Sequence, residues 1–290
     1  MKKTVNGSSY EIGKTLPDLS HQRFGMTRNI AVGIVVYHAG IELIRRFELL
    51  SLEGFDVYIF DNSPDFANVR ECSKHHPKIH YSTCGKNLGL AVGISAVAAN
   101  AYHDGHKALL FFDQDTGFNS ETLLYIEQNY LSNIINYENF SAIAFKSEGS
   151  ALVREVPLLI NSGSLYFLEK LKALGWLDCT YFVDGVDYKL CLDSLNHGFR
   201  IGACGDTPGF DHVTEQADRR YHIAGRTYSM RAYSWSRIKD TVSSNLKLIF
   251  SALKTSQFSF AANIGRLLVI YCATQIAVRM INTLGIFKRD

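Results

Sequence analysis

Short, continuously apolar runs that alternate with segments of helical spacing constrain this fold more than any other feature. The first run, Ile30 to Tyr37, is rich in β-branched residues, which is typical of a strand buried on both faces. Strands are likewise predicted at Phe55–Phe60, Lys78–Thr83, Lys107–Phe112, Ala142–Phe145 and Phe199–Cys204. Helices are predicted between them at Ile41–Leu52, Leu90–Tyr102, Ser120–Asn136 and Gly185–Asn196. We therefore expect an α/β fold in which helices flank a Rossmann-like, mostly parallel sheet.

The chain divides into three segments. A polar arm, 1–28, lacks the apolar stretch of a signal peptide and precedes an α/β domain predicted over 29–220. The region 221–290 is expected to be an amphipathic helical tail, and it is cationic because Asp240 and Asp290 are its only acids. Its most apolar run, 267–278, falls short of the roughly 20 residues that span a bilayer. We expect this tail to lie on a membrane surface or to pack on the domain.

Composition narrows the class of protein. The 290 residues carry a formal net charge of +2, which gives no general indication of nucleic acid as a partner. The six cysteines are scattered without a C-x-x-C pair, and several lie in apolar runs. We expect a protein of the reducing cytoplasm without a zinc site.

The triplet Asp113-Gln114-Asp115 directly follows a predicted buried strand. Ligands of doubly wound sheets collect at the carboxyl ends of strands, where two carboxylates two residues apart can face one hard cation. Oxygen ligands of this kind suit Mg²⁺ or Mn²⁺, and His212 is a candidate third ligand. The alternative interpretation is a polar strand end with a helix cap. It is disfavoured because Asn119 and Ser120 are better caps for the next helix.

Two further motifs indicate a nucleotide. Asp61 ends the second predicted strand, where its carboxylate can accept a hydrogen bond from the imide N–H of uracil or thymine; an Asx turn is the alternative. Asn87-Leu88-Gly89 opens a predicted helix, whose first amides can donate to a bound nucleotide.

Asp184 and Asp187 lie three residues apart at the opening of a predicted helix and therefore share one face. Either can serve as a general base that removes a proton from an attacking hydroxyl. The alternative is that both are acids favoured by the helix dipole. Trp176 and Tyr181, which flank this segment, are predicted to form an acceptor wall or part of the core.

The order of these motifs resembles family 2 glycosyltransferases of the GT-A fold, and the bacterial rhamnosyltransferase branch in particular. The resemblance covers roughly residues 29 to 235. It is carried by Val35-Val36-Tyr37, Asp61-Asn62-Ser63, Asn87-Leu88-Gly89-Leu90-Ala91, Phe112-Asp113-Gln114-Asp115, Asn161-Ser162-Gly163, and Phe182-Val183-Asp184-Gly185-Val186-Asp187 with Cys191-Leu192.

The resemblance implies a metal-dependent transfer that inverts the anomeric centre in a single displacement. Asp187 would be the catalytic base, with Asp184 as a possible second acid, and Asp113, Asp115 and His212 would hold the metal. The nucleotide would be contacted by Tyr37, Asp61, Asn87, Leu88, Gly89 and Asp113. The stretch with Arg226, Tyr228 and Arg231 is similar to the family's R-Y-Y-x-x-R-N and would contact phosphate or acceptor.

This chain departs from the family pattern beside the base. Relatives often carry an acid two residues after the base and an arginine after Cys-Leu, where this chain has Lys189 and Asp193. We predict that the two form a swapped ion pair four residues apart on the helix.

The branch implies L-rhamnose from dTDP-rhamnose as the transferred sugar. UDP-linked hexoses, including UDP-galactofuranose, are the alternative donors. The acceptor would resemble a lipid-linked oligosaccharide of O-antigen or capsule synthesis, at the inner face of the bacterial plasma membrane. A nucleotide-sugar-binding assembly subunit without activity is the alternative function.

Overall fold

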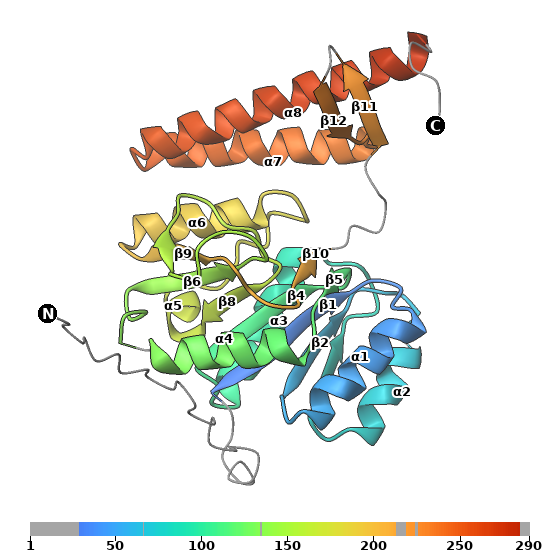
Figure 1. Cartoon of the computed structure of the whole chain (residues 1–290), viewed down its shortest axis with the longest axis vertical. Coiled ribbons are helices and arrows are strands. Elements are labelled where there is room, and N and C mark those ends of the chain that lie inside the picture. The colour runs from blue at the N-terminus through green and yellow to red at the C-terminus, as the bar shows by residue number, and fades with distance from the viewer. Residues whose placement is uncertain (1–28, 66, 134, 213–218, 224–225, 285–290) are drawn as a thin grey trace, which may run out of the picture.

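The computed structural model describes residues 29–65, 67–133, 135–212, 219–223 and 226–284. A central sheet of eight strands has the order β3-β2-β1-β4-β8-β6-β9-β7 (Figure 1). The strands are β1 (Ile30–Val36), β2 (Val57–Asp61), β3 (Ile79–Thr83), β4 (Ala108–Asp113), β6 (Phe140–Phe145), β7 (Arg154–Glu155), β8 (Ser164–Phe167) and β9 (Arg200–Cys204). The helices of this part are α1 (Ile41–Leu52), α2 (Ala67–His75), α3 (Leu90–His103), α4 (Ser120–Ser132), α5 (Leu168–Ala173) and α6 (Val186–Asn196).

The predicted α/β class is confirmed. β1 pairs in parallel with β2 and β4, and β2 pairs in parallel with β3. β8 lies antiparallel between β4 and β6, so the sheet is mixed on that side. Because β2 and β3 extend from one side of β1 and β4 adjoins the other, the strand order changes direction between β1 and β4. A ligand crevice forms at such a point.

Helices cover both faces of the sheet, and the alternation of side chains along β1 shows why. Ile30, Val32, Ile34 and Val36 point to one face, where they pack in a core with α1, α2 and α4. Ala31 and Val35 point to the other, in a core with α3, α5 and α6. A strand buried on both faces needs apolar residues at every position, which is the run that the sequence contains.

The C-terminal region differs in part from the expected helical tail. Residues 221–223 and 226–230, predicted as helix, belong instead to two antiparallel strands, β11 (Arg219–Ile223) and β12 (Arg226–Met230). Helices follow as α7 (Trp235–Lys254) and α8 (Phe258–Leu284), which lie side by side over α6 (Figure 1). Leu248 of α7 and Ile264 of α8 share the core of α3 and α6. This pair of helices therefore packs on the sheet domain.

The expectation that the tail is too short to span a membrane is also wrong. Residues Phe258–Thr283 lie in a helix that is long and apolar enough to cross a bilayer, judged by length and composition. Arg266 and Arg279 do not bound the apolar segment, because apolar residues continue beyond both of them along the helix. Only 17% of its most apolar window is buried within the chain.

Candidate functional site

The end of β2 holds Asp61 in a fixed turn. Its buried carboxylate accepts a hydrogen bond from the Ser63 amide at 2.8 Å through Oδ1, so the Asx turn considered as an alternative is present. The Tyr81 hydroxyl lies 3.4 Å from Oδ2. Asp61 pairs in register with Val36, so it lies next to Tyr37 at the same edge of the sheet.

The Asp113-Gln114-Asp115 triplet lies at the end of β4, where neighbouring segments fix its backbone. The Asp113 amide donates to Ser162 Oγ at 3.2 Å, and Gln114 Oε1 accepts from the Tyr37 amide at 2.9 Å. Asp113 is in register with Val35, so β1 alone separates it from Asp61, a distance of roughly 10 Å between strands. The two acids of the triplet are half-buried.

These acids offer the donor set of a hard divalent cation. Two carboxylates supply oxygen ligands and leave positions that phosphates and water fill around Mg²⁺ or Mn²⁺. His212 lies in β10 (Asp211–His212), which pairs with β5 (Thr116–Gly117), and its backbone is opposite Thr116. The fold thus brings the backbone of the third predicted ligand next to the triplet.

Asp187 and Asp184 differ in their surroundings. Asp187 lies in the first turn of α6, and burial, together with the charges of Asp113 and Asp184, raises its pKa to about 7. Asp184 instead accepts a hydrogen bond from Arg237 at 2.6 Å and another from the Thr241 hydroxyl, both on α7. Asp184 therefore links the loop before α6 to the C-terminal helices, while Asp187 forms no ion pair with any residue that the structure describes.

The Asn87-Leu88-Gly89 motif, a predicted nucleotide contact, lies between β3 and the start of α3. Its amides are used within the chain: the Leu88 amide donates to Asn62 Oδ1 at 3.0 Å, and the Gly89 amide donates to Asn87 Oδ1 at 2.9 Å. The next amide, of Leu90, donates to the Phe182 carbonyl at 2.6 Å. The motif therefore joins the end of β2 to the segment that carries Asp187, and these three amides are not available to a nucleotide.

The structure also gives the positions of four other predicted residues. Trp176 packs edge-on against Tyr102 in the last turn of α3, roughly 20 Å along the helix from Gly89. The main chain of Arg231 accepts a hydrogen bond from Gln275 of α8 at 2.9 Å. Arg226 and Tyr228 lie in β12, beside α8 and apart from the strand ends (Figure 1).

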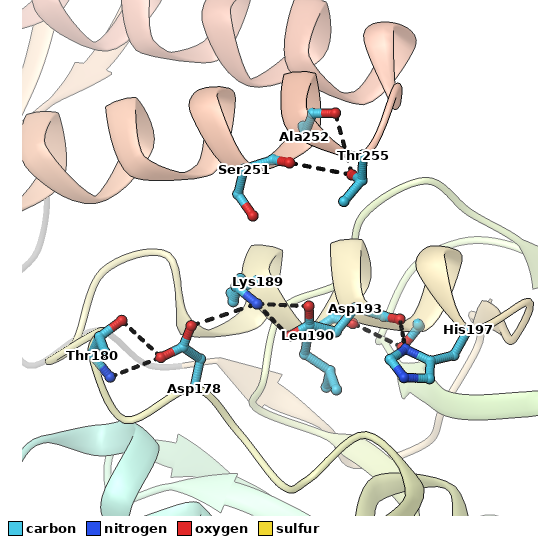
Figure 2. Close-up of polar contacts among 10 residues, drawn as sticks. Asp178, Thr180, Lys189, Leu190, Asp193, His197, Ser251, Ala252 and Thr255 are labelled. Atoms are coloured by element: carbon cyan, nitrogen blue, oxygen red, sulfur yellow. Dashed lines mark hydrogen bonds and ion pairs between the residues drawn. The ribbon is translucent and has the colours of Figure 1, made fainter.

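The predicted swapped ion pair is confirmed. Lys189 Nζ lies 2.6 Å from Asp193 Oδ1, four residues further along α6, and 3.5 Å from Asp178 Oδ2. Figure 2 shows Lys189 between these two carboxylates. Since Lys189 also reaches Asp178, it attaches the loop before α6 to the helix itself.

Several contacts of the site are not predicted from the sequence. Asn62, Ser162 and Gln114 occur in the motifs, but nothing in the sequence indicates that their side chains bind distant backbone groups. Arg237 and Thr241 lie more than 50 residues from Asp184, since their separations are 53 and 57 residues. Contacts of this kind are specified by tertiary packing alone.

The fold is one found in glycosyltransferases. TarS of S. aureus superposes with a TM-score of 0.54 at 15% identity, over 83% of this chain and 42% of TarS. A TarS fragment solved in complex with UDP-GlcNAc gives a TM-score of 0.51 at 15% identity, over 83% of this chain and 71% of the fragment.

Among curated proteins, the chain is similar to the dTDP-rhamnosyl transferase RfbF of Shigella flexneri. The two are 22% identical over 198 residues, which cover 61% of this chain and 66% of the relative. The chain therefore spans slightly less than two thirds of that protein. No family model matches it.

Replacing Gly89 by alanine should destabilise the protein strongly. Gly89 has a φ of +89°, and an added Cβ would lie 2.5 Å from the Phe182 carbonyl oxygen. Gly105 is the matched control, because its φ is +93° and nothing lies within 4 Å of an added Cβ. We expect Gly105→Ala to cost about 1 kcal/mol and Gly89→Ala at least about 3 kcal/mol in urea unfolding. Equal losses would contradict the close contact.

The elevated pKa of Asp187 predicts a pH-dependent stability. Its native pKa of about 7 exceeds the ordinary carboxyl pKa of 3.8. At pH values between these two, the native state therefore binds more protons than the unfolded state. The contribution of Asp187 to stability is therefore full at low pH and is lost as the pH rises toward 7. In metal-free buffer, the free energy of unfolding of Asp187→Asn should fall by about 2–3 kcal/mol less than that of wild type between pH 5 and 8. Asp193→Asn should retain the wild-type dependence, and identical curves for wild type and Asp187→Asn would refute the assignment.

Proposed function

We propose that this chain is a metal-dependent, inverting glycosyltransferase that uses a nucleotide sugar as donor. The observation that carries the proposal is the position of Asp187, close enough to Asp113 at the strand ends for the charge of Asp113 to raise its pKa. A base with a pKa near the working pH accepts protons most effectively. The fold and the curated relative support the class of reaction.

In this mechanism, one group of side chains would act on the sugar donor and another on the acceptor. Asp113 and Asp115, with His212, would hold Mg²⁺ or Mn²⁺, which when bound offsets charge on the diphosphate leaving group. Asp187 would take the proton of the acceptor hydroxyl as that oxygen attacks the anomeric carbon from the face opposite the leaving group. The transfer is one displacement, so the configuration inverts without a sugar–enzyme intermediate.

Asp61 would recognise the base of the nucleotide. Its Oδ1 accepts from the Ser63 amide and its Oδ2 from the Tyr81 hydroxyl, and Oδ2 would accept the imide N–H of a pyrimidine beside Tyr37 through its second lone pair. We propose dTDP-rhamnose as donor, because the curated relative is a dTDP-rhamnosyl transferase. A UDP-linked hexose, galactofuranose included, is the second candidate, favoured by the TarS fragment solved with UDP-GlcNAc.

The acceptor is proposed to be a lipid-linked glycan of O-antigen or capsule synthesis at the inner face of the plasma membrane. The exposed apolar side chains of α8 support a membrane contact, and Val269 is 68% exposed. Lysine and arginine residues of the tail would add attraction to anionic lipids.

Exchange of Asp187 for asparagine should abolish turnover and leave donor binding intact. General-base catalysis contributes roughly 10²- to 10⁴-fold, so kcat should fall by at least about a hundredfold. The measurement is product formation from dTDP- and UDP-sugars with Mg²⁺ or Mn²⁺, alongside donor binding. Asp193→Asn, on the same helix, is the control. Unimpaired turnover in Asp187→Asn would exclude this base, and absence of product from every donor with wild type would favour a non-catalytic binding subunit.

Membrane association should depend on the exposed face of α8. We expect the triple exchange of Val269, Ile270 and Ile276 to glutamine to weaken binding to anionic vesicles more than tenfold, because each large apolar side chain contributes about 1.5–3 kcal/mol on burial. Exchange of Leu49 and Leu52, exposed on α1, is the control. Flotation with vesicles at low and high salt measures both contributions. Unchanged flotation of the triple variant would make α8 a packing element.

A further inference from the structure

A group of three different metal-ligating side chains lies outside the site described above, where α1 meets α2. Glu48 projects from α1, Cys72 from α2, and His76 follows the last residue of α2. Cys72 and His76 are four residues apart, a spacing that places both on one side of a helical turn. Glu48 reaches them from the neighbouring helix.

The distances among the three side chains suit a single small cation. Glu48 Oε1 lies 3.9 Å from Cys72 Sγ and 3.7 Å from His76 Nε2, and all three ligand atoms lie within 4.8 Å of one another. Around tetrahedral zinc, with bonds of about 2.0–2.3 Å, neighbouring ligand atoms are roughly 3.3–3.8 Å apart. Both distances to Glu48 lie within a few tenths of an ångström of that range, and a shift of at most about 1 Å between Cys72 and His76 completes the geometry.

We propose that Glu48, Cys72 and His76 bind one zinc-class divalent cation that fastens α1 to α2. A set of sulfur, nitrogen and oxygen donors favours Zn²⁺ over Mg²⁺, which selects oxygen ligands. With three protein ligands, the fourth position goes to water. Bound Zn²⁺ would also balance the two negative charges of the carboxylate and the thiolate.

The surroundings of the three side chains allow a cation to enter and remain. Cys72 is 8% exposed, whereas the side chains of His76 and Glu48 are 24% and 41% exposed. Burial and the charge of Glu48 raise the pKa of the Cys72 thiol to about 11, and a bound metal would displace that proton. The nearby Glu71 is engaged by Lys74 at 2.6 Å and does not enter the group.

This site is independent of the proposed catalytic one. α1 and α2 follow β1 and β2, so a cation between them would stabilise the helices behind the strand ends that carry Tyr37 and Asp61. No zinc site is predicted from the sequence, because the cysteines are scattered without a C-x-x-C pair. The third ligand comes from a helix more than 20 residues away, since Glu48 and Cys72 are 24 residues apart.

Cobalt provides the test, since a cobalt–thiolate bond produces an intense charge-transfer absorption that oxygen ligands do not. Chelator-treated full-length protein should bind one equivalent of Co²⁺ with this absorption, and Zn²⁺ should displace it and raise Tm by several degrees. Cys72→Ala should abolish the absorption, and His76→Gln should weaken binding at least about tenfold. Cys84→Ser and His75→Gln, which alter an exposed cysteine and an exposed histidine outside the group, should match wild type, as should Asp113→Asn.

Absence of the thiolate absorption from wild type would overturn the proposal, as would its persistence in Cys72→Ala or its loss in Cys84→Ser. His76→Gln changes a partly exposed side chain outside the core, so a loss of cobalt affinity in folded His76→Gln supports the site even where Cys72→Ala fails to fold. Unchanged affinity in His76→Gln refutes it. Since Asp113→Asn tests the other metal site, failure of one proposal is distinguishable from failure of the other.

Discussion

One hydrogen bond, from the Leu90 amide to the Phe182 carbonyl, connects the two parts of the chain that carry the candidate site. It joins the start of α3, which packs against β1 and β2, to the segment that leads into α6. The approach is so close that only glycine fits at position 89, where the left-handed φ is also required. This contact adds to the core that α6 shares with α3, and together they fix the position of Asp187 relative to Asp61 and Asp113 at the strand ends.

The sheet and its main helices could be predicted from the sequence because their signals are local. A strand buried on both faces is a continuous apolar run, and the runs at Ile30 and Ala108 correspond to β1 and β4. The β11–β12 hairpin could not be predicted, because its strands carry arginine and histidine without an apolar alternation. Tyr221 and Met230 of the hairpin pack with Val278 of α8, a contact that only the tertiary structure supplies.

The acids of the site were predictable for a similar reason, since strand ends and helix starts identify Asp61, Asp113 and Asp187. Their partners were not. Gly89 illustrates the limit: its pattern indicates close backbone approach, and the sequence favours a nucleotide as the approaching group. The structure shows that the approaching group is the chain's own Phe182 carbonyl. A sequence motif therefore indicates the local backbone conformation, but it does not identify the group that the backbone contacts.

The ion pair between Asp184 and Arg237 connects the C-terminal helices to the segment before the candidate base. Arg237 belongs to α7, which is packed against α8, and Asp184 precedes Asp187 by three residues. Arg237 and Thr241 thereby attach α7 to the residue next to Gly185, where a left-handed φ of 81° opens α6. The C-terminal helices are therefore part of the framework that positions the first turn of α6, through these polar contacts and through the core that they share with it.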